Sequence, residues 1–211
     1  MKSGSQTVKS FRFSSSSLLK TKKIMYSKLR NNRTLSLMII GIRFLVGFAF
    51  IPSGLKKLLG ERFTNIGTDN PIGYYFEAMY RTGFYWEFLG FCQLLTAFLL
   101  FTQKFATLGA LMFFSIILNI CVLTISMHFT GTWIITSLML FAATVLLAWD
   151  WNKLKPILGL RISETHDYKE PSYKWQAAGL LLFILLISTS VLLRSSIWKI
   201  YTLSVFFGHR I

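Results

Sequence analysis

The feature that most constrains the fold is residues 35–60, an apolar segment long enough to cross a lipid bilayer. A helix of about 20 apolar residues covers the roughly 30 Å of hydrocarbon in a membrane. The segment nevertheless contains charged residues, and these share one helical stripe with two glycines: Arg43, Gly47, Phe50, Gly54 and Lys57. Because glycines allow close approach of a neighbouring helix and buried charges need partners, we expect the other helices to pack around this one.

Further apolar blocks follow at residues 84–102, 105–127, 132–149 and about 175–193. The chain is 53% hydrophobic and only 15% charged, with a mean hydropathy of +0.52, whereas a soluble domain carries about 25% charged residues. The short connections at residues 103–104 and 128–131 force antiparallel neighbours. We therefore predict an all-α fold, a transmembrane helical bundle with a four-span core and a fifth span.

By composition the chain divides into four parts. Residues 1–34 are a basic, Ser-rich leader that we expect to be cytoplasmic and disordered. Residues 35–155 form the four-span bundle, residues 156–174 a cytoplasmic connector, and residues 175–211 the fifth span and tail. A cleavable signal peptide is not indicated, because the first apolar block is too long and lacks a small-residue cleavage site. The sequence leaves open whether Met1 or Met25 is the true start.

The net charge of +15 indicates a membrane, not nucleic acid, once its location is considered. Nine of the 23 Lys and Arg residues precede residue 35, where no acidic residue occurs. Basic flanks of a span set its orientation and attract anionic lipid. With the amino end inside, the cytoplasmic flanks hold 15 Lys and Arg residues against seven outside. This asymmetry predicts a cytoplasmic amino terminus and an outward loop at residues 60–83.

That loop is polar and rich in aromatic residues. Asp69, Asn70 and Pro71 form a turn signal, and an aromatic cluster follows it: Tyr74, Tyr75, Phe76, Met79 and Tyr80. The cluster suits a short helix at the membrane interface, where amphipathic rings are favoured. Alternatively, it folds down into the mouth of the bundle.

The spans contain a few polar residues that form a candidate intramembrane polar site: Arg43, Lys56, Lys57, Glu87, Gln93 and Asn119. Glu87 is the only acid within a span, and we expect it to pair with Lys57 or Lys56. We expect Arg43 to pair deeper in with Gln93 or with backbone carbonyls. Asn119 shares a stripe with Ser115, Val122 and Ser126 and is expected to face the same interior. Such groups can form a functional site or simply fix the register of the bundle.

The sequence gives little support for redox, metal-binding or catalytic chemistry. Cys92 and Cys121 lie in separate apolar blocks without a CxxC motif, so we interpret them as small apolar side chains. The three His residues are scattered, and no cluster has metal-ligand spacing. Phosphate-binding loops and nucleophile elbows are missing as well. The sequence therefore predicts no catalytic residue and no metal site, and it names no cofactor.

Several motifs carry a resemblance to the DoxX-like family of small bacterial membrane proteins. The first span has the pattern R-x3-G-x5-SG-x2-K, at Arg43, Gly47, Ser53-Gly54 and Lys57. Similar stretches follow at Trp86-Glu87, QKFATLGAL, IILNI with Asn119, and LLAWDWNKLKP. The likeness covers about residues 37–155. It implies a four-helix core in a bacterial inner membrane, and some relatives are associated with quinone-linked sulfur oxidation or with complexes that handle oxidative stress.

These observations favour a non-enzymatic subunit or adaptor of a redox or envelope-stress complex. It would bind a membrane or envelope protein partner, or a lipid-like cofactor, through the aromatic loop. One alternative is a small transporter or channel component that uses Glu87 and Lys57, although the nearly apolar inner halves of the later spans disfavour a polar path. Another is a quinone-linked oxidoreductase subunit, which rests on the family resemblance alone. The oligomeric state is not indicated.

Overall fold

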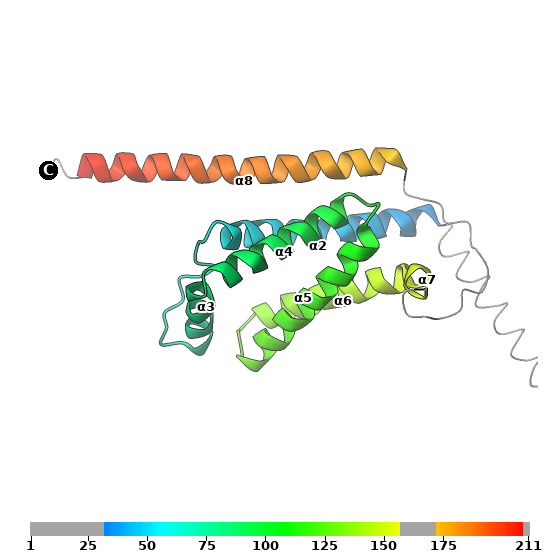
Figure 1. Cartoon of the computed structure of the whole chain (residues 1–211), viewed down its shortest axis with the longest axis horizontal. Coiled ribbons are helices and arrows are strands. Elements are labelled where there is room, and N and C mark those ends of the chain that lie inside the picture. The colour runs from blue at the N-terminus through cyan, green and yellow to red at the C-terminus, as the bar shows by residue number, and fades with distance from the viewer. Residues whose placement is uncertain (1–31, 157–171, 209–211) are drawn as a thin grey trace, which may run out of the picture. The chain divides into compact units, whose positions relative to one another are not determined.

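The computed structural model describes residues 32–156 and 172–208, and every regular element within these ranges is an α-helix (Figure 1). The helices are α2 (Arg33–Leu58), α3 (Pro71–Arg81), α4 (Phe84–Phe101), α5 (Ala106–Ser126), α6 (Thr132–Trp149), α7 (Trp151–Leu154) and α8 (Tyr173–Gly208). The predicted leader and connector fall largely outside the described residues, so both stay predictions.

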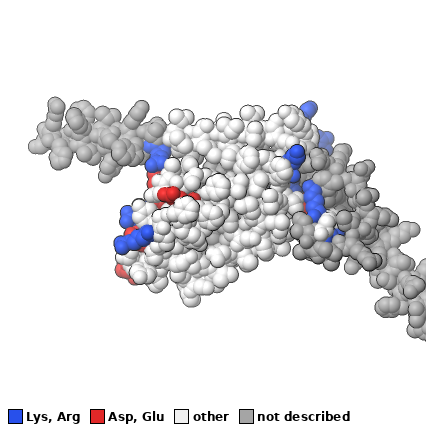
Figure 2. Space-filling model, viewed as in Figure 1, with Lys and Arg blue, Asp and Glu red and all other residues white. Residues whose placement is uncertain are grey.

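Within the described residues, five helices are long and apolar enough to cross a membrane. They are α2, α4, α5, α6 and the Tyr173–Arg194 part of α8. The predicted all-α transmembrane bundle is confirmed, and the protein is a multi-pass membrane protein. On the face seen in Figure 2, charged side chains gather at two ends and leave an uncharged band between them. The last helix continues to Gly208, well beyond the predicted end of the fifth span near residue 193.

The chain divides into two units, Met1–Gly41 and Ile42–Ile211, and the contacts below lie within the second. There α5 packs on both α4 and α6, while α4 also contacts α3 and α8. Phe50 of α2 meets Phe113 of α5 with ring centroids 4.7 Å apart, and both rings are buried. The core is built from aromatic and aliphatic side chains of α2, α4, α5 and α6.

Two glycines bring the backbones of α2 and α4 together. A Cβ atom built on Gly90 would lie 2.6 Å from the carbonyl oxygen of Gly54, and one built on Gly54 would lie 3.0 Å from the carbonyl oxygen of Gly90. A Cβ on Gly47 would similarly lie 2.6 Å from the ring of Phe101. Any larger residue would push the helices apart, so the predicted role of the α2 glycines in close approach is confirmed.

The fifth spanning helix is attached to the others near both of its ends. A Cβ atom on Gly179 would overlap the carbonyl of Phe101 at the end of α4. Further along, the ring of Phe183 packs edge-on against Phe98, with centroids 5.5 Å apart. Arg194 forms an ion pair of 2.9 Å with Glu61, just after α2. Helix α8 therefore contacts the end of α4 with its first part and the segment after α2 with Arg194.

Candidate functional site

Within the described residues, two buried polar clusters are built on α2. The first, the Arg43 cluster, consists of Arg43, Gln103, Thr107 and Asp150. Arg43 Nη1 donates to Gln103 Oε1 at 3.0 Å, and Arg43 Nη2 donates to Asp150 Oδ2 at 2.8 Å. Thr107 Oγ1 donates to the same carboxylate oxygen at 3.0 Å. The exposed fractions of Arg43, Gln103 and Asp150 are only 4%, 1% and 0%.

Local backbone geometry places these partners. Gln103 lies in the tight turn between α4 and α5 with a φ of +57°, and its amide nitrogen donates to the carbonyl oxygen of Leu100 at 2.8 Å. Asp150 is the residue that ends α6. The guanidinium of Arg43 thereby joins α2 to the ends of α4 and α6. Since a fork of planar donors can hold two acceptors at once, arginine suits this position better than lysine would.

The prediction that Arg43 pairs with Gln93 was wrong. Gln93 lies in the second cluster, while Gln103 and Asp150, which sequence reasoning did not include in the site, hold the guanidinium. The sequence signal for Asp150 was available. This acid directly follows the fourth apolar block, at the end of the bundle from which α2 enters.

The second cluster, the Lys57 cluster, consists of Ser53, Lys57 and Gln93. Lys57 Nζ donates to Ser53 Oγ at 2.7 Å and to Gln93 Oε1 at 3.1 Å, with a longer contact of 3.4 Å to the carbonyl oxygen of Ser53. Ser53 Oγ donates in turn to Gln93 Oε1 at 3.1 Å. The ammonium group therefore meets three neutral oxygens and, within the described residues, no carboxylate.

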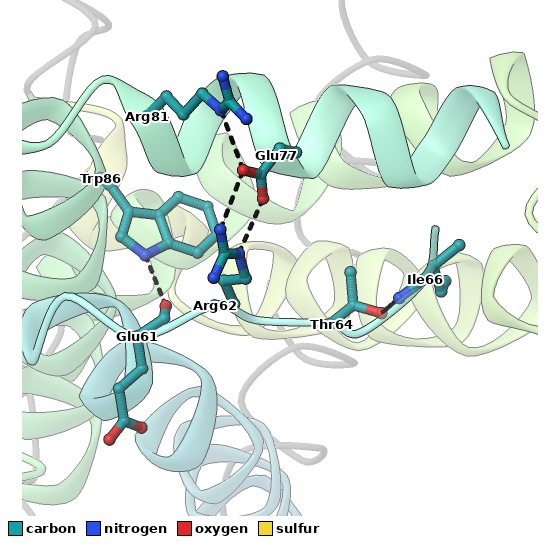
Figure 3. A network of polar contacts seen from close by, with 7 residues as sticks. All are labelled: Glu61, Arg62, Thr64, Ile66, Glu77, Arg81 and Trp86. Carbon is teal, nitrogen blue, oxygen red and sulfur yellow. Dashed lines mark hydrogen bonds and ion pairs between the residues drawn. The ribbon is translucent and has the colours of Figure 1, made fainter. Parts of the chain in front are cut away.

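Two aromatic rings cover the ammonium group. Lys57 Nζ lies 4.4 Å from the ring centroid of Phe63 and 5.2 Å from that of Trp86. The indole of Trp86 is itself fixed, because its Nε1 donates to the carbonyl oxygen of Glu61 at 2.9 Å (Figure 3). Ring faces attract a cation, so they stabilise the charge that the neutral oxygens leave uncompensated. Only 7% of Lys57 is exposed.

The expected pair of Glu87 with Lys57 or Lys56 is not formed. Glu87 and Lys56 are both exposed, and no ion pair in the described part of the chain includes either of them. Glu87 does not reach the lysines because it lies on the exposed face of α4. Trp86, Gly90 and Gln93 form its buried stripe, so the side chain that follows Trp86 points about 100° away from it.

Asn119 also lies elsewhere than predicted. It is exposed, as are the residues predicted to share its stripe, Ser115, Val122 and Ser126. Helix α5 instead buries the opposite stripe, with Phe113, Ile117 and Thr124. Of the six candidate residues, the structure brings together only Lys57 and Gln93.

The segment between α2 and α4 lies beside the Lys57 cluster. Its turn signal is confirmed, because Asn70 caps α3 by accepting a hydrogen bond from the backbone nitrogen of Ile72 at 3.0 Å, and Pro71 opens the helix. Residues 62–68 and the facing side of α3 line a pocket of about 360 Å³. Phe63 lines this pocket and also covers Lys57, so the loop folds over the mouth of the bundle.

An ion-pair network holds the loop to α3 (Figure 3). Arg62 donates to both carboxylate oxygens of Glu77, at 2.9 and 3.1 Å, and Arg81 donates to one of them at 3.0 Å. These hydrogen bonds lower the pKa of Glu77 from 4.5 to about 2, and the bond from Arg62 makes the largest contribution to this shift. The guanidinium of Arg62 also lies 4.7 Å from the ring centroid of Tyr80.

Within the described residues, no three His, Cys, Asp or Glu side chains gather in a way that could hold a metal ion. Cys92 and Cys121 are free thiols. No protein-family model, curated protein or solved structure matches this chain. The resemblance of residues 37–155 to the DoxX-like family stays a prediction from the motifs.

Proposed function

We propose that this membrane protein is a non-enzymatic, DoxX-like subunit or adaptor of a redox or envelope-stress complex, and that it binds a lipid-like ligand at the Lys57 cluster. In this proposal the protein lies in a bacterial inner membrane with its amino end in the cytoplasm. The observation that carries the binding site is a buried ammonium group that, among the described residues, contacts neutral oxygens and aromatic rings and no carboxylate.

A purely structural role accounts poorly for this lysine. Burying a charge is costly unless an opposite charge or several hydrogen bonds compensate it. The Arg43 cluster compensates its charge with a carboxylate, whereas the Lys57 cluster has hydrogen bonds to neutral oxygens and, within the described residues, no opposite charge. Intramembrane charges without a counter-ion commonly mark binding or transport sites. We therefore place the functional site at Lys57 and assign the fixing of helix register to Arg43.

The surroundings of Lys57 indicate the class of ligand. The ammonium group can donate a hydrogen bond to a ligand oxygen in place of its present bond to Ser53 or Gln93. The rings of Phe63 and Trp86 can stack on a flat or apolar head group of the same ligand. An amphiphile with carbonyl or anionic oxygens fits both features. A quinone head group belongs to this class, which keeps the quinone-linked alternative within the proposal.

The transporter alternative is less well supported. Arg43 and Lys57 are separated by about 21 Å along α2, at 1.5 Å per residue. The buried side chains between them on α2 are apolar, and one of them, Phe50, packs against Phe113 of α5. A transporter requires polar groups along the route, and the described residues supply no continuous series of them.

Mass spectrometry of ligands that co-purify with the full chain tests the proposal. We expect a bound lipid or quinone in the wild type that is depleted at least about tenfold in Lys57→Met, which keeps the length of the side chain and removes its charge. Lys56→Met is the matched control, because Lys56 is the neighbouring residue, is exposed and lies outside the cluster. Equal ligand content in both variants would place the site elsewhere.

A further inference from the structure

The α5 face opposite the core presents a polar side chain without a visible partner. Its exposed positions include Ser115, Asn119, Val122 and Ser126, which follow one another in steps of four, three and four, like the seam of a helical pair. Helix α5 packs on α4 and α6 with its other face. The seam therefore faces the hydrocarbon or another protein.

Asn119 is the residue that distinguishes these two environments. It lies thirteen residues after Ala106 and seven before Ser126, which places it within about 5 Å of the middle of the helix at 1.5 Å per residue. A carboxamide at that depth has two donors and two acceptor positions and no water to satisfy them. Within the described residues, no hydrogen bond involves the side chain of Asn119.

Other polar side chains on exposed helix faces satisfy themselves locally. Ser115 donates to the carbonyl oxygen of Leu111 at 3.0 Å, and Thr144 donates to that of Leu140 at 2.9 Å. A hydroxyl group can do this because its single donor reaches back one turn of its own helix. The carboxamide of Asn119 makes no such bond in this structure, so its hydrogen-bonding capacity stays directed away from the bundle.

We infer that the α5 seam is a homodimer interface in which Asn119 of one copy pairs with Asn119 of a second copy. Two copies inserted in the same direction share a twofold axis along the membrane normal, which brings the same residue to the same depth. The carboxamide both donates and accepts, so two of them form two reciprocal hydrogen bonds. The small Ser115 and Ser126 flank the pair and let the two α5 helices approach. A lipid head group cannot reach this depth.

Cysteine cross-linking in membranes tests the geometry. In a full chain with Cys92→Ala and Cys121→Ala, we expect Asn119→Cys to form a disulfide-linked dimer under mild oxidation. Leu138→Cys is the matched control, because Leu138 is 64% exposed and lies six residues into α6 from the end where α5 finishes, at a similar depth. Dimers through residue 138 and not 119, or a cross-link from 119 to a different polypeptide, would overturn the homodimer.

A second measurement tests the hydrogen bonds themselves. Single-molecule photobleaching in lipid bilayers should find wild-type dimers, and Asn119→Leu should weaken dimerisation by roughly tenfold. Because residue 119 faces away from the core, the thermal stability of the Asn119→Leu monomer should equal that of the wild type. The inference fails if the wild type is monomeric at high protein-to-lipid ratios, or if Asn119→Leu dimerises as strongly as the wild type.

Discussion

Arg43 and Lys57 lie on the same helix, yet their charges are compensated in different ways. The guanidinium of Arg43 meets the carboxylate of Asp150 and the amide oxygen of Gln103, so its desolvation is offset by an opposite charge and by charge-assisted hydrogen bonds. In the part of the chain that the structure describes, the ammonium group of Lys57 meets neutral oxygens and aromatic rings but no carboxylate. This difference, and not burial itself, separates a structural tie from a candidate binding site.

Removing the carboxylate of Asp150 should be strongly destabilising. Asp150→Asn preserves the shape of the side chain but leaves the charge of Arg43 buried without its counter-ion, which costs about 3–5 kcal/mol. The double variant Arg43→Met with Asp150→Leu removes both charges. Its loss of unfolding free energy should be smaller than the sum of the losses of Arg43→Met alone and Asp150→Leu alone. Thermal and chemical unfolding of the full chain in detergent measures these differences.

Glu87→Gln is the control for that comparison. Its carboxylate is exposed and has no ion pair in the described residues, so the stability should change by no more than about 0.5 kcal/mol. Equal losses for Glu87→Gln and Asp150→Asn would contradict the assignment of the buried pair.

The residue-scale errors of the sequence prediction have one physical origin. The polar residues of the spans were identifiable, because Arg43, Lys57 and Gln93 interrupt apolar segments. Their pairing was not, because it depends on the rotation of each helix about its axis. Helices that are apolar on every side carry no periodic signal for that rotation. Asn119 was assigned to the interior for the same reason.

At the scale of elements, local sequence signals performed better. The apolar blocks correctly predicted the helices that are long enough to cross the membrane, and Asn70 with Pro71 marked the start of α3. The path of the 59–70 loop could not be read from sequence. That path follows from long-range contacts, in which Phe63 covers Lys57 and Arg62 reaches Glu77.

The attachment of this loop to α3 should depend on pH through Glu77. Its folded pKa of about 2 lies below the ordinary value of 4.5, so the ion pairs stabilise the fold fully above about pH 4.5. This contribution is lost as the pH falls from there through about 2. Thermal unfolding midpoints of wild type and Glu77→Gln, measured in detergent from pH 6 to 2, should therefore differ at pH 6 and converge near pH 2.

Asp69→Asn provides the control for this pH series. Asp69 is exposed in the same loop and forms no ion pair within the described residues. Its variant should follow the wild type across the whole range. A difference between wild type and Glu77→Gln that does not shrink in acid would show that the network adds nothing to stability.

At the scale of the whole molecule, the contacts of α8 bear on the topology. Its start packs on Phe101, at the Arg43 end of the bundle, and Arg194 pairs with Glu61 at the Lys57 end. Helix α8 therefore extends from one end of the second unit to the other, as a spanning helix must. With α2, α4, α5 and α6, this gives an odd number of crossings in the described chain.

Five crossings by these helices would place the regions before α2 and after α8 on opposite sides of the membrane. The excess of Lys and Arg, 15 against seven, favours a cytoplasmic amino end. Reporter fusions after Lys104, Gly131, Lys155 and Ile211 should then read inside, outside, inside and outside. The last fusion is the decisive one, because its position depends on α8 alone. A cytoplasmic signal after Ile211, together with the expected signals at the other three positions, would mean that α8 lies along the membrane surface and does not cross it.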